Sequence, residues 1–367
     1  MAGKRIGSLV GVVLLIVGLA ACGSSKKSTT SVPAATSSTS GTVSGAGSTF
    51  AAPVYEQWAS QLSPLTVNYQ AVGSGAGITA LASKTVDFGA SDPPLKAAEE
   101  AAIAKNGSPP VQIPMFLGAI TVSYNLPGVK TGLKMEGKTI ANIWLGKITH
   151  WNDSELKSLN PGVSLPSTTI TVIHRSDSSG TTAGFTSYLA AVDPEFKSKV
   201  GSGKDVQWPT GTGAKGNAGV AGAVAQTTGA VGYVEQAYAL QHNFTYAAVK
   251  NAAGNFVSPS LASTTAAASG IVVPANLGFA IVNPKGAEAY PLTSQTFIVV
   301  NMDPCKAGIP GGESAAKGVG KFINYGLSSA GQSVLAQADY AALPASVLSR
   351  SKAAAASLQC NGSPLGA

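Results

Sequence analysis

The chain has 367 residues, of which 44% are hydrophobic and only 11% are charged, and its formal net charge is +7. A chain of this length and apolar content can bury a sizeable core, which excludes disorder for most of it and suggests about two domains. Its Lys and Arg residues are scattered without a basic stripe, so the positive charge does not indicate a nucleic-acid partner.

The start of the chain, residues 1–21, is typical of an export signal. Two basic residues precede an apolar run at residues 8–18 (SLVGVVLLIVG) that is too short to span a bilayer comfortably. Residues 19–22 (LAAC) resemble the bacterial lipobox, which implies cleavage before Cys22 and attachment of fatty acids such as palmitate to that cysteine. A plain secretory signal with a chance cysteine is the alternative, and both interpretations predict that the mature protein works outside the cytoplasm.

Residues 22–42 form a stretch rich in Ser, Thr and Gly without periodicity. Such a stretch buries little apolar surface and predicts a flexible tether with an end-to-end distance of roughly 25 Å. A lipid on Cys22 would therefore hold a folded body, beginning near Val43, at the outer face of the cytoplasmic membrane, on a cell surface or in a periplasm.

Beyond the tether, β-rich runs alternate with helical ones. Strands are predicted at residues 65–72, 119–125, 169–175, 230–235 and 296–301. Helices are predicted at residues 53–62, 77–83, 139–147, 183–192 and 318–328. This alternation predicts an α/β architecture with a mixed or parallel sheet.

Three joints that precede predicted helices are rich in Gly, Ser and Thr: residues 45–50 (GAGSTF), 72–77 (VGSGAG) and 175–182 (RSDSSGTT). Helix N-termini carry unpaired N–H groups and the positive end of the helix dipole, so each joint can hold an oxyanion. The alternative is that these hydroxyls are only helix caps. Three such joints, one of them with an arginine, favour the oxyanion site.

Charged residues at two places strengthen that hypothesis. Arg175 can donate two parallel hydrogen bonds to a tetrahedral oxyanion, and Asp177 would orient its guanidinium, although a plain surface ion pair is the alternative. Asp92 follows a short strand, and its carboxylate can only accept hydrogen bonds. It would accept the P–OH of phosphate and repel fully ionised sulfate, whereas the alternative is a turn residue before two prolines.

Seven stretches, in one collinear order from about residue 45 to 350, resemble the phosphate-binding proteins of the bacterial phosphate-specific ABC transporter. They are GAGSTFAAPVYEQW, YQAVGSGAG, VDFGASDPPL, IWLGKITHWND, HRSDSSGTTAGFTSYL, KGNAGVAGAVAQTTGAVGYVE and YPLTSQTFIVV. The resemblance implies a type II periplasmic-binding fold, in which two α/β lobes joined by two hinge crossings close on a ligand. It implies one lobe from residues 45–118 plus 278–350, a second lobe from residues 119–277, and a C-terminal tail at residues 351–367.

The resemblance also implies the residues that bind phosphate. They are the side chains of Thr49, Ser74, Asp92, Arg175, Ser179 and Thr181 and the backbone amides of Phe50 and Gly180. Asp177 matches the family position that pairs with the arginine. Ser48 and Ala51 depart from the commoner residues of the family, and we expect the donors to be unaffected by these changes.

The implied function is extracytoplasmic binding of inorganic phosphate and its delivery to the permease and ATPase subunits of an ABC transporter. We expect a monomer without enzymatic activity, cofactor or metal. A binder of another tetrahedral oxyanion such as sulfate is one alternative, and a secreted phosphatase is another. The three histidines are dispersed, however, and a G-x-S-x-G nucleophile motif is absent from the sequence.

Two nucleotide-binding motifs and a cysteine pair also occur in the chain. Residues 132–139 (GLKMEGKT) and 211–216 (GTGAKG) match nucleotide-binding motifs, but neither follows a buried strand, so we do not expect nucleotide binding. Cys305 and Cys360 form an even pair outside the cytoplasm, without metal-ligand spacing, which favours a disulfide that ties the tail to a loop.

Overall fold

The structure is a computed structural model that describes residues 41–365. The predicted export signal, Cys22 and almost all of the predicted tether lie outside the described residues. The predicted start of the folded body near Val43 falls in the first strand, β1 (Thr42–Gly47).

The described residues form a nine-stranded mixed sheet with the strand order β2-β1-β3-β12-β4-β8-β6-β7, and β9 pairs with β4 beside this path. Its other strands are β2 (Thr66–Ala71), β3 (Phe88–Ser91), β4 (Pro110–Tyr124), β6 (Thr171–Arg175), β7 (Thr212–Ala214), β8 (Ala230–Glu235), β9 (Thr245–Tyr246) and β12 (Thr293–Asn301). The pairs β1–β2, β1–β3, β6–β7 and β6–β8 are parallel, whereas β12 is antiparallel to both β3 and β4.

Strand β4 joins two halves of this sheet. Its residues 110–119 pair with β12, and its residues 120–124 pair with β8. We call β1, β2, β3 and β12 the first half of the sheet and β6, β7 and β8 the second half. Almost every residue of β4 is buried, so this long apolar strand belongs to the core of both halves.

Two small sheets and the helices complete the fold. The small strands are β5 (Lys134–Met135), β10 (Ala248–Lys250), β11 (Phe256–Val257), β13 (Gln359–Cys360) and β14 (Ser363–Pro364). The helices are α1 (Ala52–Ser60), α2 (Ser74–Ala82), α3 (Ala97–Ala104), α4 (Gly137–Trp144), α5 (Ser154–Leu159), α6 (Gly180–Val192), α7 (Pro194–Lys199), α8 (Gly216–Gln226), α9 (Gln236–Gln241), α10 (Leu261–Ala267), α11 (Pro304–Ala307), α12 (Gly312–Leu327), α13 (Ser329–Ser333) and α14 (Ala345–Ala356), with a 3₁₀ turn at Leu335–Ala338.

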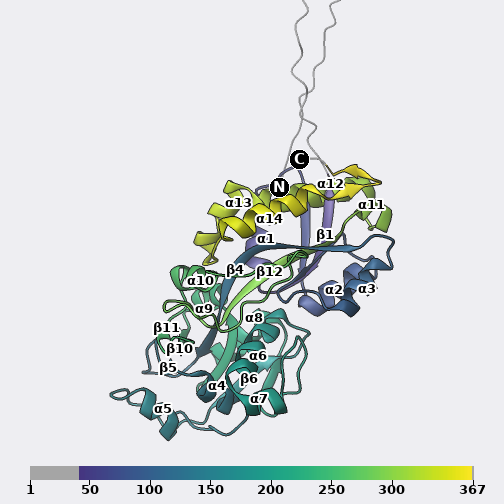
Figure 1. Cartoon of the computed structure of the whole chain (residues 1–367). Helices are drawn as coiled ribbons and strands as arrows, with labels where there is room; N and C mark the ends of the chain where they lie inside the picture. Colours follow the sequence, from purple (N-terminus) through teal and green to yellow (C-terminus); the bar gives the residue numbers. More distant parts are fainter. Residues whose placement is uncertain (1–40, 366–367) are drawn as a thin grey trace, which may run out of the picture. The chain divides into compact units, whose positions relative to one another are not determined.

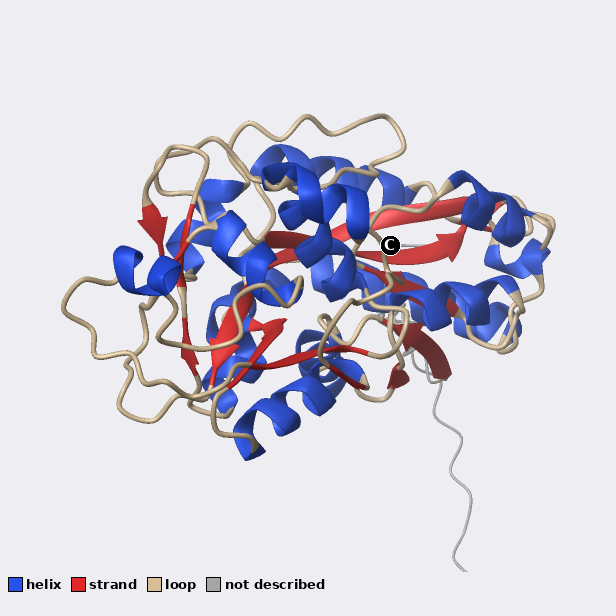
Figure 2. Ribbon diagram, turned by 90° about the horizontal axis from the view of Figure 1, so that it is seen from below, coloured by secondary structure: helices blue, strands red, loops and turns tan. Residues whose placement is uncertain are grey.

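Helices cover the strands of both halves (Figures 1 and 2). Helices α2 and α12 pack on β1 in the first half, and α8 packs on β6 and β8 in the second half. Helix α6 contacts β4, β8 and β12, so it reaches strands of both halves. Among residues 41–365, none of the helices combines the length and the apolar character that crossing a membrane requires.

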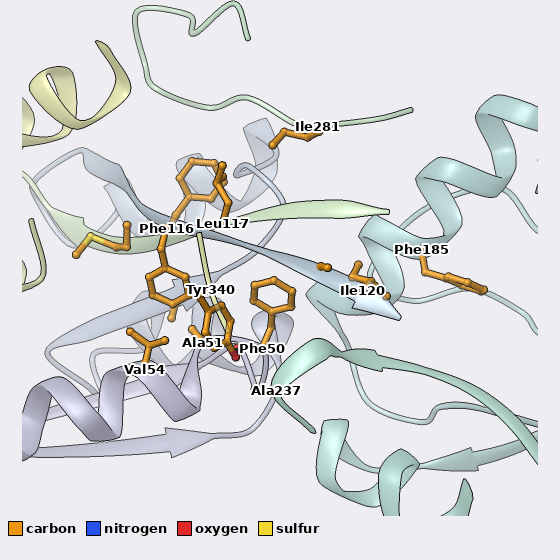
Figure 3. Packing of buried hydrophobic residues seen from close by; sticks show 14 of the residues in the cluster. Phe50, Ala51, Val54, Phe116, Leu117, Ile120, Phe185, Ala237, Ile281 and Tyr340 are labelled. Carbon is orange, nitrogen blue, oxygen red and sulfur yellow. The ribbon is translucent and has the colours of Figure 1, made fainter. Parts of the chain in front are cut away.

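Buried aromatic rings fill the core beside the sheet. The rings of Phe50 and Tyr340 meet edge to face with their centroids 5.8 Å apart. Figure 3 shows these side chains among the buried hydrophobic residues. The Tyr340 hydroxyl donates a 2.6 Å hydrogen bond to the carbonyl oxygen of Phe50. Because such edge-to-face pairs and buried hydrogen bonds favour one geometry, the turn that contains Phe50 is held firmly at the end of β1.

The five predicted strands and the five predicted helices are all present, and all of them except β8 have shifted ends. The β1 strand was missed, because a six-residue run with two glycines carries little of the side-chain pattern that marks a strand. Helices α2 and α6 each begin three residues earlier than predicted, at Ser74 and Gly180. The shift places three of the predicted oxyanion ligands, Ser74, Gly180 and Thr181, within the first helical turns.

Cys305 and Cys360 lie at the C-terminal end of the described chain. Their Sγ atoms are 2.03 Å apart, the distance of a disulfide bond, and the bond closes a loop over a sequence separation of 55 residues. The bond fastens β13 to α11, next to the first half of the sheet.

Candidate functional site

The three joints that the sequence singles out come together in one place. They are the turn after β1 with Thr49, the start of α2 with Ser74, and the loop between β6 and α6. The N–H of Gly75 donates to the carbonyl oxygen of Ser178 at 3.0 Å, which connects the second joint with the third. The N–H of Asn217 donates to Oγ1 of Thr49 at 3.3 Å, which connects the first joint with α8. The predicted ligands therefore converge from both halves of the sheet.

All of the side chains in this cluster are buried. Thr49 is 5% exposed and Arg175 is 4% exposed, and the other predicted ligand side chains, Ser74, Asp92, Ser179 and Thr181, are no more than 1% exposed. Buried polar groups are stable only where they find partners. The cluster is therefore a built polar site in an otherwise apolar interior.

Glycines allow the joints to approach one another closely. Gly73 has a φ of 95°, and a Cβ there would lie 2.5 Å from Oδ2 of Asp177. A Cβ on Gly180 would lie 2.1 Å from Oδ2 of Asp92 and 2.4 Å from Oγ of Ser74. A side chain at either glycine would therefore collide with the opposite half of the site.

Arg175 ends β6 and supplies the positive charge of the site. Its Nε and Nη2 atoms donate to Oδ1 and Oδ2 of Asp177 at 2.7 and 2.5 Å, a bidentate ion pair. Its Nη1 atom lies 3.4 Å from both Oγ1 of Thr181 and Oδ1 of Asn217. Because Asp177 occupies one edge of the guanidinium, the Nη1 edge is directed toward the start of α6.

Asp177 is held as a carboxylate. Burial opposes its ionisation, but the hydrogen bonds and charge of Arg175, with the N–H of Gly216 at 2.9 Å, keep the pKa of Asp177 below its ordinary value. An Asp177 that is ionised near neutral pH keeps the guanidinium in one orientation and offsets part of its charge.

Asp92 has different neighbours. Its Oδ1 atom accepts hydrogen bonds from the hydroxyls of Ser48 at 2.5 Å and Thr296 at 2.9 Å, and its Oδ2 atom lies 3.4 Å from Oγ of Ser74. Burial raises the pKa of Asp92 to about 6, while these hydroxyls and the positive charge of Arg175 oppose that rise. At neutral pH Asp92 is therefore mainly a carboxylate that can accept a hydrogen bond.

The start of α6 supplies backbone donors. Ser179 is the N-cap residue, and its Oγ atom accepts from the N–H of Thr182 at 3.0 Å. Gly180 and Thr181 follow in the first turn, where N–H groups have no partner within the helix. Together with the positive end of the helix dipole, these groups favour an anion at this position.

Three residues that the sequence analysis did not assign belong to this cluster. Asn217, at the start of α8, contacts Arg175 and Thr181 through its side chain. Thr296 and Ser48 donate to Asp92, so the departure at Ser48 places a hydroxyl donor on that carboxylate. Gly216 and Asn217 begin α8, so this is a fourth glycine-containing helix start, and that signal was available in the sequence.

The histidine rings contact residues other than the predicted ligand side chains: His150 contacts Thr149, His174 contacts Trp208, and His242 stacks on Phe244. His174 stacks on Trp208 with ring centroids 5.3 Å apart, and its Nδ1 atom is 3.0 Å from the carbonyl oxygen of Arg175. Among residues 41–365, no group of three or more His, Cys, Asp or Glu side chains is arranged to hold a metal ion.

Comparisons with known proteins agree with this architecture. Residues 32–330 match the model of the PBP superfamily domain, a class of binding proteins. The phosphate-binding protein PstS of Haemophilus influenzae is 42% identical over 316 residues, which cover 84% of this chain and 91% of the relative. The PstS of Xylella fastidiosa (strain Temecula1) is 44% identical over 277 residues, which cover 74% of this chain and 75% of the relative.

A solved structure shows the same fold. The phosphate-binding protein from Stenotrophomonas maltophilia aligns with a TM-score of 0.68 at 21% identity and covers 85% of this chain and 93% of the solved chain. The fold is therefore the predicted α/β type II periplasmic-binding fold. The chain belongs to the PBP superfamily and, within it, to the PstS family of phosphate-binding proteins.

Proposed function

We propose that this chain binds inorganic phosphate outside the cytoplasm and delivers it to the permease of an ABC transporter. The observation that carries the proposal is the convergence of a buried arginine, two helix starts and a buried carboxylate in one polar cluster. The printed names of the relatives, phosphate-binding protein PstS, support the same ligand.

The proposed ligands combine charge with hydrogen-bond donors. Arg175 supplies most of the positive charge, and the remaining groups replace the water shell of the anion. They are the side chains of Thr49, Ser74, Ser179 and Thr181 and the backbone amides of Phe50 and Gly180. Because a desolvated anion needs a partner for each lone pair, loss of one neutral donor should cost about 1 to 3 kcal/mol of binding free energy.

Asp92 distinguishes phosphate from other tetrahedral oxyanions. Phosphate retains at least one P–OH group near neutral pH, and Oδ2 of Asp92 can accept its hydrogen bond. Sulfate carries no proton at that pH, so a buried carboxylate would face a fully charged oxygen. Sulfate binding is the second candidate function, and this unfavourable contact counts against it.

We also propose that the two halves of the sheet are lobes that close on the ligand, with residues 45–118 plus 278–350 in one lobe and 119–277 in the other. The change in pairing partner of β4 between Ala119 and Ile120 supports the first crossing. The second crossing falls at the boundary between residues 277 and 278, and Leu277 has a φ of 61° there. The ion pair between Glu99 and Lys204 is one of the contacts that would break on opening.

The relatives are named as binding proteins, and we propose that this chain likewise acts as a monomeric binder without enzymatic activity. A phosphatase needs a nucleophile or a metal-bound hydroxide beside the phosphorus atom. Steady release of phosphate from a chromogenic phosphate ester, with and without added metal, would contradict this part of the proposal.

Attachment to the membrane rests on the sequence. We propose that Cys22 carries the lipid and that residues 23–42 tether the folded body to the outer face of the cytoplasmic membrane. Labelled palmitate should be incorporated by the full chain but not by its Cys22→Ala variant, which should move from the membrane fraction to the soluble one. Equal labelling of both chains would overturn the anchor.

Calorimetric titration of the phosphate-depleted chain with phosphate and with sulfate, at equal ionic strength, tests the binding proposal. We expect one phosphate per chain and a preference over sulfate of at least about 100-fold. Equal affinities for the two anions would reject phosphate as the specific ligand.

A further inference from the structure

The carboxyl group of Asp92 has two oxygens in unlike surroundings. Two hydroxyl donors, Ser48 Oγ and Thr296 Oγ1, meet at Oδ1, at 2.5 and 2.9 Å. The Oδ2 atom lies against Gly180, where a Cβ would be only 2.1 Å away. Oδ1 therefore accepts two short hydroxyl hydrogen bonds from the first half of the sheet, whereas Oδ2 has the longer 3.4 Å hydrogen bond from Ser74 Oγ and is directed at the start of α6.

An irregularity of the sheet brings Thr296 to this position. The register between β12 and β4 shifts between Thr296 and Phe297, since Thr296 pairs with Phe116 whereas Phe297 pairs with Pro114. Such bulges redirect side chains and are frequent beside functional sites. The neighbouring Gln295 donates from Nε2 to the carbonyl oxygen of Asp92 at 2.6 Å, so this part of β12 holds both the backbone and the side chain of Asp92.

Ser48 reaches the same oxygen from the turn after β1. Its own backbone is held by two bonds, from its N–H to the carbonyl oxygen of Ala90 at 3.1 Å and from the Tyr69 hydroxyl to its carbonyl oxygen at 2.8 Å. Ser48 is 1% exposed and Thr296 is fully buried, so water cannot readily replace either hydroxyl.

The other charged and titratable groups around Asp92 stay in one state near neutral pH. Arg175 faces it from β6 as a permanent cation and is itself paired with Asp177. Burial raises the pKa values of Tyr55, Tyr69 and Tyr340 well above the ordinary tyrosine value, so these phenols remain neutral. The hydroxyl donors are thus the local groups whose removal would alter Asp92 without changing a charge.

We propose that Ser48 and Thr296 are specificity-determining positioning residues, which hold Oδ1 of Asp92, leave Oδ2 for the ligand, and keep the carboxyl ionised. An oxyanion that carries a proton then completes the hydrogen bonding of the site, and one without a proton does not. This inference rests on the proposed binding of phosphate, and it assigns the control of selectivity to two residues that need not touch the anion.

The loss of a hydroxyl donor to Asp92 should change how sulfate binding depends on pH. Hydroxyl donors stabilise the carboxylate, so their removal raises the pKa of Asp92 above about 6 and lets it hold a proton closer to neutral pH. A protonated Asp92 can donate to sulfate. Sulfate binding should therefore begin at a higher pH in a chain that lacks either hydroxyl.

The test measures sulfate and phosphate affinity between about pH 5 and pH 8.5 for Thr296→Val and Ser48→Ala. Valine keeps the shape of threonine without its hydroxyl. If one lost donor moves the titration of Asp92 by about one pH unit, sulfate affinity near pH 7 should rise roughly fivefold. The double variant should show a larger shift, and Thr296→Ser should keep the original profile.

Two controls separate this effect from a general disturbance of the fold. Thr293→Val removes a buried hydroxyl on the same strand, one that donates to the carbonyl oxygen of Tyr290 at 2.9 Å, and should leave the pH profile unchanged. In an Asp92→Asn background, Thr296→Val should no longer alter the profile, because the group that titrates is gone.

Failure of this proposal is distinguishable from failure of the proposed function. If the unmodified chain binds phosphate but Thr296→Val and Ser48→Ala both keep its sulfate profile, the positioning role is overturned and phosphate binding stands. If the unmodified chain does not bind phosphate, the proposed function fails and this inference fails with it. Should Thr296→Val not fold, Ser48→Ala decides the question alone.

Discussion

Two aspartates, the buried Asp92 and the partly buried Asp177, lie on opposite sides of the same site, and their environments differ. Asp177, beside the second half of the sheet, is paired with a guanidinium, which lowers its pKa despite burial. Asp92, beside the first half, has hydroxyl donors and no cation in contact, so burial dominates and raises its pKa to about 6. One residue type therefore serves as a fixed counter-charge in one half and as a proton-sensitive acceptor in the other.

The largest loss of phosphate affinity is expected when the cation that separates the two aspartate environments, Arg175, is removed. Arg175→Ala should weaken phosphate binding by at least about 100-fold, since it removes charge-assisted hydrogen bonds from a desolvated anion. Calorimetric titration measures the loss. The phosphate affinity of Arg175→Lys should lie between those of the unmodified chain and Arg175→Ala, because an ammonium group cannot donate in the same bidentate way. Unchanged affinity in Arg175→Ala would contradict the site assignment.

A smaller loss of phosphate affinity is expected from a change at Gly180, where the two halves of the site are in contact. In Gly180→Ala the new Cβ would lie 2.1 Å from Oδ2 of Asp92, so the halves could not approach as closely. We expect about 10-fold to 100-fold weaker phosphate binding, by titration, at the usual cost of overpacking. Gly222→Ala in α8 is the matched control, because a Cβ there has no neighbour within 4 Å, and it should bind like the unmodified chain. Equal affinities of the two variants would argue against closure at Gly180.

The two aspartates should affect stability with opposite dependence on pH. The lowered pKa of Asp177 means that its contribution is present near neutral pH and is lost as the pH falls through that pKa. The raised pKa of Asp92 means that its contribution is greatest in acid and is lost as the pH rises from about 4 through about 6.

Urea unfolding at several pH values, without phosphate, measures this contrast. The stability deficit of Asp177→Asn relative to the unmodified chain should shrink in acid. The free energy of unfolding of Asp92→Asn should rise relative to that of the unmodified chain as the pH rises, by on the order of 2 kcal/mol. If the stability difference from the unmodified chain changes with pH in the same direction for both variants, the two carboxyls are not in different environments.

The smallest effect on binding is expected far from the site. Cys305→Ser with Cys360→Ser removes a bond that spans 55 residues and should lower the free energy of unfolding by about 2 to 4 kcal/mol. Phosphate affinity should change less than about twofold, because none of the proposed ligands lies near that bond. A large loss of affinity would mean that the tail acts on the site.

Much of the fold and of the candidate site was predictable from local sequence. The chemistry of two patterns can be inferred from the sequence: the hydroxyl-rich joints before helices, and Arg175 two residues from Asp177. The weak points have physical causes. β1 was missed because its glycines carry no side-chain pattern, and the starts of α2 and α6 were set too late because Gly and Ser have low helix propensity although they suit first turns.

The sequence by itself determined the chemistry of this protein: which side chains carry charge, which joints expose backbone donors, and the family to which the chain belongs. Only the tertiary structure decided which oxygen of Asp92 accepts the two short hydroxyl hydrogen bonds and which one faces the start of α6. Ser48 and Thr296 are 44 and 204 residues away from Asp92 in sequence, yet both donate to Oδ1. A hydrogen bond depends on distances of a few tenths of an ångström, and for residues so far apart those distances are set by the packing of the sheet.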